Sequence, residues 1–187
     1  MRDALRIGVL AVQGNFREHV AMLRRLRADV VEVRKPEQLE GLDGLVVPGG
    51  ESTAIGRLVH VSGLEEPLAR FEGPLLGTCA GMILFDRRHL GFLDVEVARN
   101  AYGRQVASFE ANVDLAGEEP IRGVFIRAPR VEDVGTDVEV LGRLDDEPVL
   151  VRQGRVLAAS FHPELTDDTR VHEKFLEIVR EAVHVRA

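Results

Sequence analysis

The chain has 187 residues, a formal net charge of −7 at neutral pH and 45% apolar residues. Its length suits one domain with one core, since single domains usually hold roughly 100–200 residues. The negative charge argues against binding to nucleic acid, which relies on clustered lysines and arginines. No apolar run approaches the roughly 18–20 residues that a membrane helix needs, so we expect a soluble protein without a membrane partner.

The start of the chain, its single cysteine and its two lysines narrow the class of protein further. Strand-like sequence begins at Leu5, which leaves no room for a signal or transit peptide, so we expect a cytoplasmic protein. The single cysteine, Cys79, cannot form an internal disulfide and suits a reducing compartment. The only lysines, Lys35 and Lys174, do not form a plausible carbonyl-binding site. We expect neither a cofactor nor a metal ion in this chain.

The first half alternates short apolar runs with amphipathic stretches. The runs predict strands at residues 5–12, 29–33, 45–47 and 75–76, and the stretches predict helices from residue 16, from residue 53 to about 61 and after residue 79. Asn15 and Glu18 have the spacing of a capping box at the start of the first helix. This alternation indicates a mostly parallel sheet with helices on both faces, whose ligands bind beyond the carboxyl ends of the strands.

The second half has a different pattern. Alternating segments predict strands at residues 93–97, 106–113, 123–127, 138–144, 149–153 and 156–161, divided by Gly, Pro and Asp turns. We expect these strands to be partly antiparallel. The last segment reads as a helix with the apolar stripe Val171, Phe175, Ile178 and Ala182, capped by Thr166 or Asp167. Residues 1–187 thus predict one α/β domain.

Cys79 lies in the sequence Gly-Thr-Cys-Ala-Gly at residues 77–81, between a predicted strand and a predicted helix. Small residues there allow the sharp turn of a nucleophile elbow, which presents the side chain above the sheet. The helix start favours a thiolate, and its N–H groups can stabilise an oxyanion. The alternative, a small buried apolar residue, is common for lone cysteines. It does not require the flanking glycines, so we interpret Cys79 as a nucleophile.

His162 is the best candidate for a base among the six histidines. It ends the apolar run 156–161, and Glu164 follows two residues later, where an extended chain would point both side chains the same way. Pro163 places the pair at a strand end. Cys79, His162 and Glu164 can then act as nucleophile, base and orienting carboxylate. The other histidines are interpreted as surface residues: His19, His172 and His184 on helices, and His60 and His89 elsewhere.

A glycine-rich turn, Val-Pro-Gly-Gly-Glu-Ser-Thr at residues 47–53, follows another predicted strand. It lacks the Gly-Lys-Ser/Thr ending of a phosphate loop. A Gly-Gly pair at a strand end suits a backbone N–H aimed at an oxyanion, and Glu51 and Ser52 add polar groups for an amino-acid substrate. Such pairs are also common in ordinary turns.

Taken together, the motifs resemble one known family along essentially the whole chain. They are the segments 8–14, 17–19, 48–53, 77–81, 99–100, 103–105, 125–129 and 160–165. This combination is similar to the glutaminase subunits of pyridoxal 5′-phosphate synthase, which are class I glutamine amidotransferases. The resemblance implies a flavodoxin-like three-layer sandwich and hydrolysis of L-glutamine, with the ammonia passed to a separate synthase subunit in a large hetero-oligomer.

The resemblance also assigns roles to particular positions. Cys79, His162 and Glu164 form the catalytic triad. The residues implied to bind glutamine are Gly50, Glu51, Ser52, Arg99, Ile126 and Arg127, and the oxyanion would be met by the Ala80 N–H and by one N–H of the Gly49-Gly50 turn. An arginine fork suits the α-carboxylate of glutamine. Gln13 resembles the segment that faces the synthase and helps to organise the oxyanion hole. The connection at residues 86–91 is shorter than is usual in the family, which predicts a trimmed surface loop.

Two other interpretations remain. The chain could be the glutaminase subunit of another amidotransferase, such as imidazole glycerol phosphate synthase, with the same triad and a different partner. It could also be a non-catalytic protein of similar fold in which the cysteine elbow senses oxidation. The pair His162 and Glu164 and the arginines weigh against a redox protein, and the segments 50–53 and 125–129 favour the vitamin B6 assignment.

Overall fold

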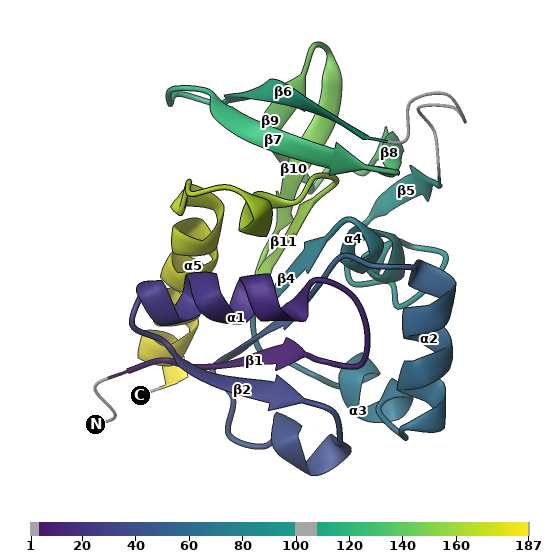
Figure 1. Cartoon of the computed structure of the whole chain (residues 1–187), viewed down its shortest axis with the longest axis vertical. Coiled ribbons are helices and arrows are strands. Elements are labelled where there is room, and N and C mark those ends of the chain that lie inside the picture. The colour runs from purple at the N-terminus through teal and green to yellow at the C-terminus, as the bar shows by residue number, and fades with distance from the viewer. Residues whose placement is uncertain (1–3, 100–107, 187) are drawn as a thin grey trace.

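A computed structural model describes residues 4–99 and 108–186, the last of them by its backbone alone (Figure 1). Two segments that carry the resemblance, Asn100 and 103–105, lie outside the described residues, as does the start of the strand predicted at 106–113. A nine-stranded mixed sheet, in the order β2-β1-β3-β4-β11-β10-β9-β6-β7, runs through the molecule, and β5 and β8 form a second sheet. The predicted single α/β sandwich is confirmed as a fold class.

Five neighbouring strands make the parallel half of the large sheet. They are β2 (Asp29–Val33), β1 (Arg6–Leu10), β3 (Gly44–Val47), β4 (Leu75–Thr78) and β11 (Val156–Ala159). Counted along the chain, this is the 2-1-3-4-5 order of flavodoxin-like folds. Strands β3 and β4 are buried at every residue, as their unbroken apolar runs require in a sheet that is covered on both faces.

The antiparallel half continues from β11. It consists of β10 (Glu147–Gln153), β9 (Glu139–Leu144), β6 (Ser108–Leu115) and β7 (Ile121–Ile126), each antiparallel to its neighbour. The second sheet pairs β5 (Val95–Ala98) with β8 (Arg130–Val134). The expectation of antiparallel strands in the second half is confirmed. Strand β8 was not predicted, because only Val131 of its five residues is buried and the others carry no apolar alternation.

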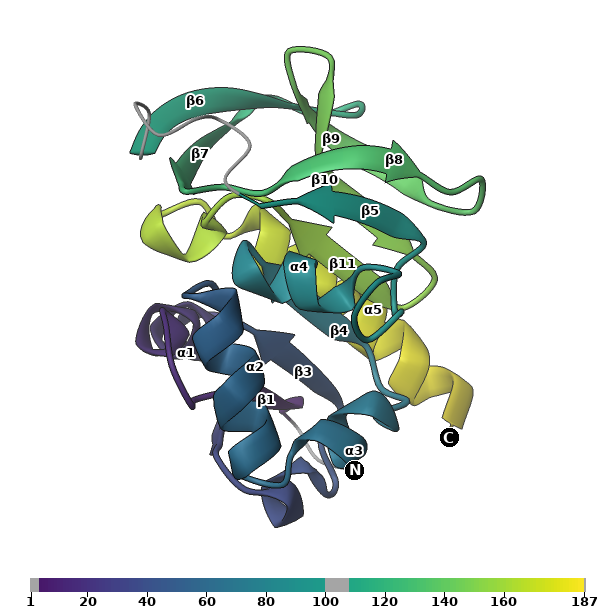
Figure 2. The same cartoon turned by 90° about the vertical axis from the view of Figure 1, so that its right-hand side faces the viewer.

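Helices cover both faces of the parallel half, as expected. On one face lie α1 (Phe16–Arg25) and α5 (Arg170–Arg186), and on the other lie α2 (Ser52–Val61), α3 (Glu65–Ala69) and α4 (Ala80–Phe85) (Figures 1 and 2). Two short 3₁₀ helices, η1 (Pro36–Leu39) and η2 (Pro163–Leu165), complete the fold. Each face has its own apolar cluster. No helix in the described ranges has the length and apolar character needed to cross a bilayer.

The start of α5 corrects one prediction. The helix begins at Arg170, whose N–H donates to the Asp168 carboxylate at 3.0 Å, and not at Thr166 or Asp167. Thr166 instead accepts a hydrogen bond from the Asp168 N–H at 3.3 Å, within a turn that follows η2. The four residues of the predicted stripe, Val171, Phe175, Ile178 and Ala182, are all buried. The apolar period therefore identified the helix, whereas its cap depended on the preceding turn.

The three motifs of interest meet at one edge of the sheet because their strands are neighbours. Val47 of β3 pairs with Gly77 of β4, and Ala159 of β11 pairs with Thr78 of β4. The glycine-rich turn, the cysteine and the histidine therefore leave the sheet side by side, at the carboxyl ends of parallel strands.

Truncating Phe175 should show how far the fold depends on α5. Its ring is 0% exposed within the cluster that α5 shares with the sheet. Phe175→Ala should lower the free energy of unfolding by about 3–5 kcal/mol, measured by urea denaturation. The matched control on the same helix is Val185→Ala, since Val185 is 79% exposed and should change that free energy by less than about 0.5 kcal/mol. Equal effects of the two changes would contradict this packing.

Candidate active site

Cys79 occupies a strained turn between β4 and α4. Its backbone has φ 50° and ψ −103°, a conformation that non-glycine residues rarely adopt and that is typical of functional turns. The flanking glycines make this turn possible: a Cβ on Gly81 would lie 2.2 Å from the Val47 carbonyl oxygen, and one on Gly77 would lie 2.6 Å from the Phe85 ring. The predicted nucleophile elbow is therefore present, and the Cys79 thiol donates to the Ile126 carbonyl at 3.7 Å.

His162 and Glu164 are paired, although not in the way the sequence suggested. Strand β11 ends at Ala159, and residues 163–165 form the 3₁₀ helix η2, so the segment is not extended through Glu164. The turn nevertheless brings Nδ1 of His162 to 2.7 Å from Oε1 of Glu164. Pro163 at the start of η2 explains the difference, because its fixed φ suits a helical turn as well as a strand end.

The charges of this pair follow from its surroundings. Burial opposes a protonated ring, but the Cys79 thiol and the Glu164 carboxylate outweigh it and raise the pKa of His162 to about 10. Burial alone would raise the pKa of Glu164, but the rings of His19 and His162 reverse this and lower it to about 2. At neutral pH the pair is therefore an imidazolium and a carboxylate.

The glycine-rich turn packs directly against the nucleophile and the base. A Cβ on Gly49 would lie 2.3 Å from Cε1 of His162 and 3.3 Å from Cβ of Cys79, so no side chain fits there. The Gly49 N–H donates to the Thr78 hydroxyl at 3.1 Å and is thereby occupied. Among the described residues, the N–H groups of Gly50 and Ala80 have no such partner.

Gln13 holds the other side of the same turn. Its side-chain oxygen accepts a hydrogen bond from the Glu51 N–H at 3.1 Å, and a Cβ on Gly50 would lie 2.4 Å from that oxygen. The neighbouring Gly14, with φ 91°, would place a Cβ 1.9 Å from the Gly49 carbonyl oxygen. This carbonyl accepts from the Asn15 N–H at 2.9 Å. The segment after β1 thus sets the position of the glycine-rich turn.

A cavity of about 690 Å³ opens beside Cys79. Its lining contains residues from every part of the predicted site, namely Asn15, Gly50, Glu51, Ser52, Thr53, Cys79, Ile83, Arg99, Ser108, Ile126, Arg127 and His162. The six residues assigned to glutamine binding all line it. Glu164 lies behind His162, and Gly49, Ala80 and Gln13 lie outside the lining, next to residues that belong to it.

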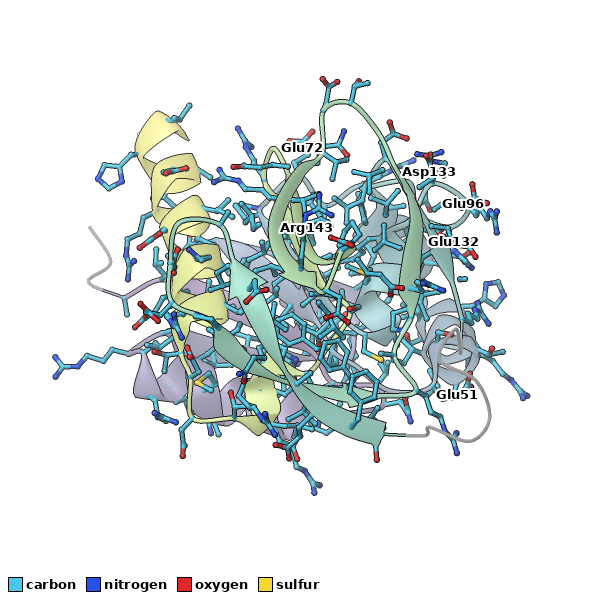
Figure 3. All side chains as sticks on the ribbon, turned by 90° about the horizontal axis from the view of Figure 1, so that it is seen from above. Glu51, Glu72, Glu96, Glu132, Asp133 and Arg143 are labelled. Atoms are coloured by element: carbon cyan, nitrogen blue, oxygen red, sulfur yellow. The ribbon has the colours of Figure 1, made fainter. Side chains whose placement is uncertain are left out.

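Two polar residues of this cavity have partners that the sequence did not indicate. The Glu51 carboxylate caps α2, accepting from the N–H groups of Thr53 at 3.0 Å and Ala54 at 2.7 Å, which lowers its pKa. Seen from above, Glu51 lies at the end of α2 (Figure 3). Arg99 donates to the Thr53 hydroxyl at 3.2 Å and contacts Nε2 of His89 at 3.3 Å.

Comparison with known proteins gives a clear relationship. A model of the SNO glutamine amidotransferase family matches residues 9–181. The chain belongs to this family. A relative from Pelotomaculum thermopropionicum, named pyridoxal 5′-phosphate synthase subunit PdxT, is 54% identical over 185 residues, covering 92% of this chain and 94% of the relative.

Solved structures of glutamine amidotransferase fold also match this chain. A crystal structure described as a glutamine amidotransferase matches with a TM-score of 0.88 and 51% identity, covering 93% of this chain and 98% of the other. A crystal structure of a putative GMP synthase protein from Thermoplasma acidophilum matches with a TM-score of 0.79 and 18% identity, covering 100% of this chain and 99% of the other. At that identity the second match supports the fold alone.

Asn15 has contacts in this SNO-family site that the sequence analysis did not predict. Asn15 was predicted to cap α1, but its side chain makes no capping bond. Nδ2 of Asn15 lies 3.2 Å from Nδ1 of His162 and 3.4 Å from Oε1 of Glu164. Asn15 therefore contributes to the orientation of the His162 and Glu164 side chains. An asparagine just before a helix is readily explained as a helix cap. Its contact with a residue 147 positions further along leaves no pattern in the local sequence.

His19 and His172 also differ from the prediction, since both are 0% exposed and not at the surface. They are in contact behind the triad, with Nδ1 of His19 2.9 Å from Nε2 of His172. Their charged neighbours in sequence suggested solvent, but each helix turns these histidines towards the sheet. The surface interpretation is confirmed for His60, His89 and His184, and the connection at 86–91 is a short loop with Asp86 buried beneath it.

The buried pair predicts how stability depends on pH. The raised pKa of His162 stabilises the fold fully below about pH 6.5 and loses this effect as pH rises towards 10. The lowered pKa of Glu164 stabilises it above about pH 4.5 and loses this effect as pH falls towards 2. Glu164→Gln should thus lower the free energy of unfolding most, by about 3 kcal/mol, between about pH 4.5 and pH 6.5, and by less at lower or higher pH. Urea denaturation of the wild type and the variant at several pH values measures this loss. A loss that does not change with pH would contradict the ion pair.

Proposed function

We propose that this chain hydrolyses L-glutamine to L-glutamate and ammonia, and that the ammonia passes to a synthase subunit that makes pyridoxal 5′-phosphate. The observation that carries the proposal is that one cavity is lined by Cys79, by His162 and by all six residues assigned to glutamine binding. The family match and the name of the 54% identical relative support the choice of reaction and of partner.

The reaction begins with the thiolate. Cys79 attacks the side-chain amide carbon of glutamine, and a carbon–sulfur bond forms while the carbonyl oxygen becomes an oxyanion. The N–H groups of Gly50 and Ala80 are the donors proposed to stabilise this oxyanion, since the Gly49 N–H is occupied by Thr78. Protonated His162 then gives its proton to the leaving nitrogen, the carbon–nitrogen bond breaks, and ammonia leaves a thioester on Cys79.

The second half of the reaction restores the enzyme. His162, now neutral, takes a proton from water, and the resulting hydroxide attacks the thioester carbon. A second oxyanion forms in the same place and collapses with loss of the Cys79 thiolate, which releases glutamate. Glu164, 2.7 Å from Nδ1 of His162, keeps the ring oriented and compensates its charge in both halves.

Recognition of glutamine rests on the rest of the cavity. Arg99 and Arg127 offer guanidinium groups to the α-carboxylate, and Ile126, whose carbonyl lies 3.7 Å from Sγ of Cys79, lines the wall beside the reacting amide. Arg127 has φ 45°, a strained conformation of the kind found at binding sites. Glu51 and Ser52 complete the polar rim, Glu51 mainly by capping the helix that carries Ser52.

The partner is proposed to be a separate synthase chain in a large hetero-oligomer. Gln13 is the residue proposed to connect the two subunits, because it precedes α1 and holds the Glu51 N–H of the glycine-rich turn. A synthase docked near Gln13 would stabilise the turn that carries the proposed oxyanion donor. Ammonia release would then be coupled to the presence of the chain that consumes it.

Adding the synthase subunit should therefore raise glutamine hydrolysis. We expect slow ammonia release by the purified chain alone and at least about tenfold faster release with the synthase, measured by a coupled glutamate assay. Gln13→Ala should reduce the stimulation, and because Gln13 also holds the Glu51 N–H of the glycine-rich turn, it should lower the basal rate as well. Equal rates with and without the partner would contradict the coupling, and stimulation by a different synthase instead would favour another amidotransferase.

Cys79→Ala should separate the two half-reactions of the complex. Removing the nucleophile should reduce glutamine hydrolysis by at least about 10³-fold, because Cys79 is the one cysteine of the sequence. Synthesis of pyridoxal 5′-phosphate supported by added ammonium salts should remain, since the synthase would no longer need this chain as a source. Wild-type hydrolysis by the variant would remove Cys79 from its role and leave the redox interpretation open.

A further inference from the structure

A cluster of buried polar side chains lies behind the triad, and the proposed reaction does not use all of it. His19, Thr78 and His172 are 0% exposed and Glu164 is 6% exposed. Nε2 of His19 lies 3.0 Å from Oγ1 of Thr78 and 3.4 Å from Oε2 of Glu164. Nδ1 of the same ring lies 2.9 Å from Nε2 of His172. His19 is thus the centre of the cluster.

The second oxygen of Glu164 makes His19 more than a packed core residue. Oε1 is held by His162 and Asn15, whereas the buried Oε2 forms no regular hydrogen bond with any described residue. The ring of His19 is the polar group that faces it. A buried carboxylate oxygen without a donor would be costly, so the electrostatic contact with His19 at 3.4 Å helps to stabilise it.

This contact determines which nitrogen of His19 carries the proton. A proton on Nε2 points at the Thr78 oxygen and lies beside the Glu164 carboxylate, whereas a bare Nε2 would place a lone pair 3.4 Å from an anion. Nδ1 is then the acceptor for the N–H on Nε2 of His172. This leaves Nδ1 of His172 as a bare nitrogen, which agrees with its lack of any hydrogen-bond partner among the residues described.

Both histidines are neutral in this arrangement. The groups that face His19 are Glu164, His162, His172 and Glu18, and burial outweighs the two carboxylates and lowers the pKa of His19. Burial, together with the neighbouring His19 ring, lowers the pKa of His172 to about 3. His19 therefore acts as an N–H donor and not as a second cation. It can hold the Glu164 charge without competing with His162 for a proton.

The same N–H reaches the oxyanion turn through one further residue. Thr78 lies between Nε2 of His19, at 3.0 Å, and the N–H of Gly49, at 3.1 Å. Nε2 of His19 therefore contacts both the Glu164 carboxylate, which orients His162, and the Thr78 hydroxyl, which holds the glycine-rich turn. Positioning by such buried contacts is important for catalysis, since small displacements of reacting groups cost large factors in rate.

We propose that His19 is a positioning residue for glutamine hydrolysis, whose Nε2–H holds Glu164 and Thr78 and so keeps the base and the glycine-rich turn aligned. This inference rests on the proposed function. It assigns no contact with glutamine to His19, so the Michaelis constant for glutamine should depend little on it, whereas kcat should depend on it strongly.

Two variants of similar size test the role of Nε2 of His19. His19→Gln places a side-chain N–H close to the position of Nε2, and His19→Asn places its amide near the position of Nδ1 only. In the complex with the synthase, we expect His19→Gln to keep kcat within about threefold of wild type. His19→Asn should lower kcat on the order of tenfold or more, with the KM for glutamine changed less than about twofold.

The pH profile of the same variants separates positioning from general destabilisation. Without the Nε2 donor the Glu164 carboxylate is protonated more easily, so the acidic limb of kcat/KM should move to higher pH by at least about half a unit in His19→Asn. It should stay in place in His19→Gln. The control is His172→Leu, which removes an equally buried imidazole whose hydrogen-bond partner among the described residues is His19, and which should lower thermal stability without moving the limb.

The outcomes distinguish this inference from the proposed function. A wild-type complex that releases no ammonia would overturn both. An active wild type with His19→Asn and His19→Gln equally active, or equally impaired, would overturn the positioning role alone. NMR of the wild-type protein with ¹⁵N-labelled histidine gives a test that needs no variant: a proton on Nε2 of His19 supports the inference, and a proton on Nδ1 with Nε2 bare overturns it.

Discussion

Burial of the Glu164 carboxylate is the constraint on which the site depends. A charge that is 6% exposed must be met by donors from several directions, because water cannot solvate it. Two donors are His162 on the same turn and Asn15 at the start of α1, and His19 of α1 lies 3.4 Å from the second oxygen. The need to compensate one carboxylate thus ties α1 to η2, elements that are distant in the sequence.

Close approach of backbone segments is the second constraint. The Gly49 backbone fits against the His162 ring and Cys79 only because it has no side chain, and Gly14 and Gly81 meet the neighbouring carbonyl oxygens in the same way. Each of these glycines lies where two segments leave the sheet together. These glycines lose more conformational freedom on folding than other residues would, but they allow Cys79, His162 and the glycine-rich turn to lie in direct contact.

The junction of the two halves of the sheet explains where the substrate cavity lies. The parallel half supplies Cys79, His162 and the turn at residues 49–52 at its carboxyl edge. The antiparallel half places Ile126, the last residue of β7, and Arg127, which follows it, over that edge. Chemistry thus comes from the common geometry of parallel strands, and the walls that can select a substrate come from the extension.

The sequence by itself determined the features that have a local cause. Apolar runs identified the strands other than β8, the 3.6-residue period identified α5, and the flanking glycines identified the elbow at Cys79, because each depends on neighbours along the chain. Only the tertiary structure decided the roles of Asn15 and His19. Their partners lie across the fold, so the local pattern predicted a helix cap and a surface histidine, whereas contact with a buried carboxylate made both part of the site.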